Sequence, residues 1–144
     1  MKDRIRNSLV LHGLVATLLG VVSGAVLAFI LTGDIPGGAR AWHQAHLQGI
    51  MSGLLAMAAG AFVRHLRLGE GALRFMGWAF ILQAYGFSLG TVAGALTGHR
   101  GLEAVMPVGN IVLYVAYTIA GVSSLAGVIV ALYGALAARR GVPG

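Results

Sequence analysis

The sequence predicts an all-α membrane protein in which four transmembrane helices form a single domain. Of its 144 residues, 58% are hydrophobic and only 10% are charged, whereas a soluble domain carries about a quarter charged residues. Four apolar stretches are each long enough to cross about 30 Å of hydrocarbon. We therefore expect transmembrane helices at residues 8–31, 41–63, 72–96 and 106–136.

Short polar segments separate these helices. A basic stretch at residues 1–7 precedes the first helix, and the apolar run after it exceeds the about 7–15 residues of a signal-peptide core, which favours a mature helix. Turn-forming residues at 32–38 follow this helix. The next connection, around residues 64–71, is basic, and residues 97–103 form a short polar loop before the fourth helix.

The basic residues predict the orientation in the membrane. Cytoplasmic loops of membrane proteins are enriched in Lys and Arg, and this asymmetry is largest here if both termini are cytoplasmic. The formal net charge of +6 is therefore explained by the orientation in the membrane and does not indicate nucleic-acid binding. The inner segments then hold Lys2, Arg4, Arg6, Arg64, Arg67, Arg74, Arg139 and Arg140, and the outer loops hold Arg40 and Arg100.

The outer part of the second helix, Ala41–Gly53, carries the main candidate for function. Ionisable side chains inside a bilayer are costly and often functional. His46 is open to three interpretations: a hydrogen-bonded packing residue, an axial metal ligand or a proton carrier. Its depth, the nearby Gly49 and Gly53 and the lack of helical carboxylates favour a haem ligand. The two glycines share the face of His46 and would leave a smooth groove for a flat ring.

Several polar residues of other helices are expected at a similar depth. At 1.5 Å per residue, His46 lies roughly 7 Å inside the outer end of its helix, and Thr91 and Asn110 lie at about the same level. We expect a pocket that opens outward or sideways into the lipid. His12 is too far from His46 to share one haem within a subunit, which leaves an open iron position. Other residues at or just below this level are Gln48, Ser52, Tyr85, Ser88 and Tyr114.

Two absences limit the chemistry. The sequence has no cysteine, which excludes disulfides, thiolate ligands and a cysteine nucleophile. All four carboxylates lie near the N-terminus or in predicted loops, which argues against an acid-lined cation pathway and against hydrolysis by paired carboxylates. Chemistry would therefore have to come from a cofactor, with hydroxyl and amide side chains in support.

The sequence also resembles the styrene oxide isomerases, a family of bacterial membrane enzymes. The similarity covers most of the chain, with sparse identities. The matching residues are His12-Gly13 with Thr17–Gly20, Ala45-His46 followed by Gly53, Leu82–Leu102, and Gly109-Asn110-Ile111.

This resemblance implies a four-helix subunit of a homotrimer in the bacterial inner membrane, with haem b between neighbouring subunits and His46 as its axial ligand. Ferric iron in the family acts as a Lewis acid toward an epoxide oxygen, and a 1,2-hydride shift yields an aldehyde without net redox. Metal coordination would stabilise the developing alkoxide. A dry pocket would keep water from trapping the cation as a diol.

The sequence departs from the family at three positions. Ser52 replaces an asparagine, Thr91 replaces a tyrosine and Gln83 replaces an aspartate. The first two family residues are thought to hold the epoxide, and the hydroxyls here reach less far. Tyr85 or Tyr114 would supply the missing phenol.

The predicted function is therefore a haem b-binding membrane protein that isomerises a small apolar epoxide. His46, Gly49 and Gly53 bind the cofactor in this prediction. Two alternatives remain: a non-catalytic haem protein that binds a gas or relays redox state, and a small channel or transporter without cofactor. The predicted pocket residues are Ser52, Thr91, Tyr85 and Asn110.

Overall fold

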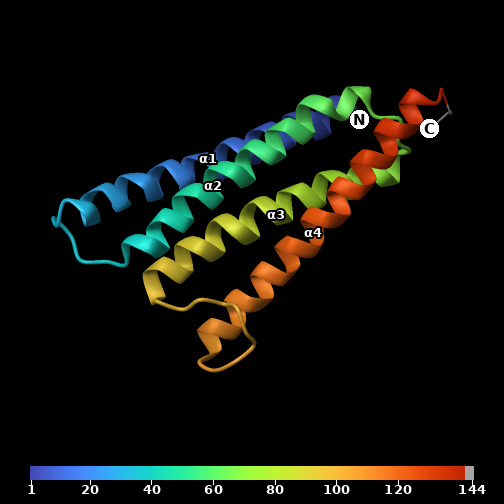
Figure 1. The fold of residues 1–144 in the computed structure, drawn as a ribbon. Helices are drawn as coiled ribbons and strands as arrows, with labels where there is room; N and C mark the ends of the chain where they lie inside the picture. The colour runs from blue at the N-terminus through green and yellow to red at the C-terminus, as the bar shows by residue number, and fades with distance from the viewer. Residues whose placement is uncertain (142–144) are drawn as a thin grey trace.

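The computed structural model describes residues 1–141 as a bundle of four long helices (Figure 1). They are α1 (Lys2–Leu31), α2 (Ala39–Phe62), α3 (Glu70–Thr97) and α4 (Val108–Arg139), with a short 3-10 turn, η1 (Val63–His65), after α2. Each long helix is long and apolar enough to cross a membrane. No strand occurs in residues 1–141. The predicted four-helix fold is thus confirmed.

The helices alternate in direction, so both ends of the described chain lie at one end of the bundle (Figure 1). We call this the terminal end, and the end that holds residues 32–38 and 98–107 the loop end. Helices α1 and α2 form the closest pair, and α3 packs on both of them. Helix α4 packs mainly on α3, and it diverges from α2 toward the loop end. A space lined by α2, α3 and α4 is the consequence.

Glycines allow the close approach of α1 and α2. A Cβ atom on Gly20 would lie 2.5 Å from the backbone nitrogen of Ile50, and one on Gly49 would lie 2.5 Å from the Cα of Gly20. Such distances leave no room for any side chain at either position. Small residues at helix contacts are a usual basis of packing in membranes, where burial of apolar surface gives no drive.

The terminal end extends further than the hydropathy predicted. Helix α1 begins at Lys2, six residues before the predicted start. Lys2 Nζ donates to the carbonyl oxygen of Leu66 at 2.7 Å, and Arg64 contacts Asp3 at 2.6 Å. These contacts hold the polar first turns against the connection between α2 and α3. A buried apolar cluster lies beneath them and comprises Leu9, Val63, Leu66, Leu68, Leu73, Met76 and Phe80.

One asparagine organises the connection between α3 and α4. Asn110 Oδ1 accepts from the backbone N–H of Gly101 at 2.8 Å. Its Nδ2 donates to the carbonyl oxygens of Glu103 at 2.8 Å and Val105 at 3.1 Å. Helix α4 begins at Val108, two residues after the predicted start, because Pro107 is extended and serves as the N-cap.

Candidate functional site

His46 lies on the side of α2 that faces α1. Its Nδ1 is 2.9 Å from the carbonyl oxygen of Gly20. A carbonyl oxygen can only accept, so Nδ1 carries the proton and donates. The lone pair of the neutral ring is therefore on Nε2. This is the arrangement found in metal-ligating histidines, whose second nitrogen donates to a carbonyl or carboxylate.

The ring occupies a recess that only a glycine permits. A Cβ atom on Gly24 would lie 2.5 Å from Nδ1 of His46 and 2.8 Å from Cε1. The imidazole is half-buried. Within residues 1–141 its Nε2 has no hydrogen-bond partner, yet it is not enclosed. An oriented imidazole with a free, accessible nitrogen fits a single axial ligand to a haem.

The structure assigns Gly49 and Gly53 a different role from the predicted one. Both face α1, and a Cβ atom on Gly53 would overlap Thr17 and the carbonyl oxygen of Gly13. The expected open groove beside His46 is therefore wrong, because α1 fills it. The glycines that bear directly on His46 are Gly20 and Gly24, which belong to α1.

A cavity of about 510 Å³ opens between α2, α3 and α4 at the loop end. This volume is typical of small-molecule sites. Of the four predicted pocket residues, only Thr91 lines this cavity. Gln48, which was expected at a similar depth, lines it as well. The complete lining is Gly38, Arg40, Ala41, Gln44, Gln48, Phe87, Thr91, Gly94, Ala95, Gly98, His99, Arg100, Leu102 and Tyr117.

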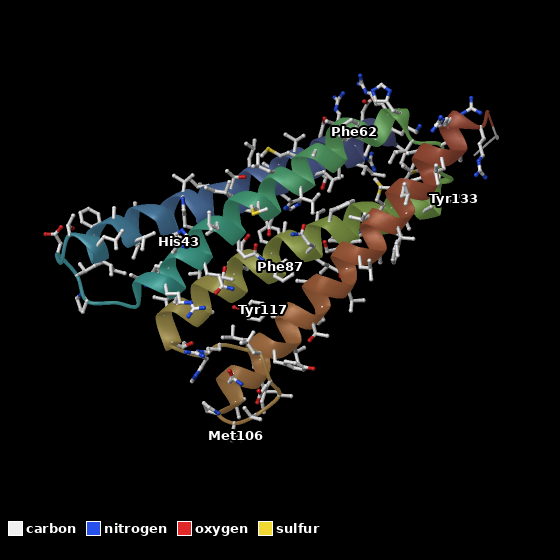
Figure 2. The ribbon with its side chains drawn as sticks, in the orientation of Figure 1. His43, Phe62, Phe87, Met106, Tyr117 and Tyr133 are labelled. Carbon is white, nitrogen blue, oxygen red and sulfur yellow. The ribbon has the colours of Figure 1, made fainter. Side chains whose placement is uncertain are left out.

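Two hydroxyls in this cavity differ in what they can donate. Thr91 Oγ1 donates within its own helix, with the carbonyl oxygens of Phe87 and Ser88 at 2.7 and 3.2 Å. The single proton of Thr91 is thus used, and only its lone pairs are free. Tyr117 stacks on Phe87 with ring centroids 6.3 Å apart, between α3 and α4 (Figure 2). Its phenol has no hydrogen-bond partner in residues 1–141 and is a free donor.

The remaining predicted pocket residues lie elsewhere. Ser52 is 2% exposed in the interior of the bundle and does not line the cavity. Asn110 uses both polar atoms of its amide to hold the loop. Tyr85 faces α1, where its hydroxyl is 2.9 Å from Nδ1 of His12. The structure therefore does not bring these three side chains to Thr91.

Tyr117 is the site residue that the depth estimate missed. Tyr114 and Tyr117 are one turn apart, so depth alone does not separate them. The helical period of α4 could have separated the two tyrosines. Asn110, Leu113 and Ala120 are buried, at spacings of three and seven residues, and so lie on one face. Tyr117 falls in the same row, which faces α3. Close contacts of its ring with Gly90 and Gly101 follow from this position.

His46 and the cavity lie on opposite sides of α2. The cavity is lined by Gln44 and Gln48, which are two residues before and after His46. Two residues correspond to about 200° around a helix, so His46 points away from the cavity at nearly the same height. One chain therefore presents the imidazole and the cavity at one level but in different directions.

These features define a class: a polytopic, four-helix membrane protein with a histidine oriented by a backbone carbonyl and a separate lateral cavity. A comparison with protein-family models matches residues 5–136 to the model described as styrene oxide isomerase. The chain belongs to the styrene oxide isomerase family. No individual curated protein matches it.

Proposed function

We propose that the protein is a haem b-dependent isomerase that converts a small apolar epoxide to an aldehyde. The observation that carries this proposal is the hydrogen bond from His46 Nδ1 to Gly20, which leaves Nε2 free to bind iron. Family membership supports the same reaction. No three His, Asp or Glu side chains gather to hold a bare metal ion in residues 1–141, whereas a haem needs one such ligand.

His46 would hold the haem, with Gly20 and Gly24 fixing its ring. When bound, ferric haem supplies a Lewis acid that draws electron density from an epoxide oxygen as the ring opens. The Gly20 carbonyl holds the Nδ1 proton, so the imidazole keeps one tautomer and one orientation. Gly24 keeps the space that this orientation requires.

The cavity residues would receive the substrate. Tyr117 carries the free phenol and would donate to the epoxide oxygen as negative charge develops there. Thr91 offers only lone pairs in its present hydrogen-bonding arrangement. The rings of Phe87 and Tyr117 would exclude water from the opened epoxide, which favours the aldehyde over a diol.

The geometry supports an oligomer, because the imidazole and the cavity of one chain face apart. In a ring of copies about an axis normal to the membrane, every residue keeps its depth. His46 of one copy and the cavity of the next would then meet at one level. We propose a homotrimer, as the family resemblance implies, in the bacterial inner membrane with both termini cytoplasmic.

Product analysis tests the activity. The purified oligomer, loaded with haem under oxidising conditions, is incubated with styrene oxide, and phenylacetaldehyde is measured. We expect the aldehyde from the wild type and from His43→Ala, since His43 is exposed and lies outside the proposed site. We expect none above background from His46→Ala. Equal turnover by all three proteins would contradict the proposal.

One observation favours a non-catalytic haem protein as a second candidate. Ser52 and Thr91 occupy the positions where the family resemblance places the epoxide-holding groups. Ser52 is buried in the bundle and Thr91 donates to its own helix. A haem-loaded protein that binds carbon monoxide in its ferrous state but converts no epoxide would support this candidate.

A further inference from the structure

Two arginines stand at the mouth of the cavity. Arg40 lies in the first turn of α2 and Arg100 lies in the connection after α3, and both side chains are exposed. Both line the cavity. The sequence has ten Lys and Arg residues, and the chain path places only these two at the loop end. The basic residues of that end are therefore concentrated at one opening.

No acidic residue neutralises this mouth. Asp3 pairs with Arg6 and Arg64, and Glu70 pairs with Arg74, all at the terminal end. Neither Asp34 nor Glu103 lines the cavity. Two uncompensated guanidinium groups beside a low-dielectric wall attract an anion. Arginine also matches carboxylates in a bidentate geometry.

Below the mouth, Gln44, Gln48 and Thr91 share the cavity wall with aromatic and small apolar residues. Arg40 and Gln48 are eight residues apart along α2, so the cavity extends roughly 12 Å along this helix. Phe87 and Tyr117 supply aromatic faces further in. A flat, largely apolar ring over the opening of this cavity, with an anionic edge at the loop end, would meet both arginines and leave the interior of the cavity to the substrate.

We propose that Arg40 and Arg100 bind the propionate carboxylates of the haem held by His46 of a neighbouring copy. This inference rests on the proposed function, and it assigns the haem a second point of attachment and one orientation. The level of His46 agrees with that of the cavity, because Gln44 and Gln48 flank it in sequence. The anionic edge of the ring then lies toward the loop end and the apolar edge lies deeper in the membrane.

The test titrates haem into the purified haem-free oligomer and follows the Soret absorption. The comparison includes haem b, its dimethyl ester, the double variant Arg40→Gln/Arg100→Gln, and the control Arg139→Gln, which removes an exposed arginine from the terminal end. We expect the double variant to bind haem b about tenfold or more weakly. The ester should bind the wild type and the double variant equally, at that weaker affinity. The affinity of the Arg40→Lys/Arg100→Lys variant for haem b should lie between those of the wild type and the Arg40→Gln/Arg100→Gln variant.

Several outcomes would overturn the inference. Equal affinity of the wild type for haem b and for its ester would show that the carboxylates are not bound. Unchanged haem affinity in the double variant, with haem lost in His46→Ala, would remove this inference and leave the proposed function intact. A wild type that takes up no haem would remove both. Loss of a copurified anionic lipid from the double variant, with haem affinity unchanged, would assign the arginines to lipid instead.

Discussion

The side chain of His46 donates from Nδ1 to the carbonyl oxygen of Gly20 at 2.9 Å, across the interface of α1 and α2. This hydrogen bond joins the two closest helices of the bundle and fixes the tautomer and orientation of the imidazole. The acceptor is a backbone atom, so substitution at position 20 would not remove it directly. The ring is instead sensitive to Gly24, which faces it one turn further along α1.

Gly24→Ala should weaken haem binding without unfolding the protein. The added Cβ would lie 2.5 Å from Nδ1, so the imidazole has to move from its hydrogen bond. Loss of such a supporting contact typically costs about 10–100-fold in metal affinity. Haem titration of the oligomer measures the change. Gly121→Ala is the matched control, because a Cβ there meets no atom within 4 Å; equal losses in the two variants would contradict this account.

Tyr117→Phe should slow epoxide turnover while haem binding is retained. The substitution removes the free phenol but keeps the aromatic ring that stacks on Phe87. Loss of one donor to a developing oxyanion lowers kcat by about 10²–10³-fold. Aldehyde formation at saturating styrene oxide measures it.

Tyr85→Phe provides the control for that experiment. Its hydroxyl contacts His12 and not the cavity, so we expect kcat close to that of the wild type. A Tyr85→Phe variant that loses turnover while Tyr117→Phe keeps it would transfer the donor role to Tyr85.

Asn110→Ala should destabilise the loop end. It removes the acceptor of the buried Gly101 N–H and the donor to Glu103 and Val105. An unpaired buried polar group costs about 1–3 kcal/mol, so the thermal unfolding temperature should fall. Asn110→Asp retains the acceptor for Gly101 but sets a second oxygen against the carbonyl oxygens of Glu103 and Val105, so it should be destabilised as well. If both variants match the wild type in thermal unfolding, the side chain does not organise this connection.

Hydropathy and charge were sufficient to predict four helices, because crossing a bilayer requires long apolar runs. They placed the start of α1 at Ser8 instead of Lys2, since hydropathy does not register the polar contacts of Lys2 and Asp3 with the α2–α3 connection. They placed His46 on the correct helix. Depth alone, however, left the rotation of each helix undetermined.

The rotation of each helix about its own axis determines which residues face the cavity and which face another helix. Gly49 and Gly53 share the face of His46 as predicted, but the tertiary contact with α1 covers that face. Ser52 and Tyr85 lie at plausible depths but do not line the cavity, and the hydroxyl of Tyr85 contacts His12 instead. Thr91 does line the cavity. Tyr117 was not predicted, because depth alone does not distinguish it from Tyr114, one turn away. A helical period combined with packing partners is needed to separate such residues, and a single sequence supplies only the period.

The central claim is that Nε2 of His46 binds haem iron, and chemical rescue tests it most directly. His46→Gly is purified as the oligomer, supplied with haem, and its Soret spectrum is recorded with and without added imidazole, beside wild type and His43→Gly. We expect wild-type spectra from His43→Gly, little bound haem in His46→Gly, and recovery of the bound-haem spectrum when imidazole replaces the missing side chain. A His46→Gly protein that binds haem like the wild type without imidazole would contradict the account.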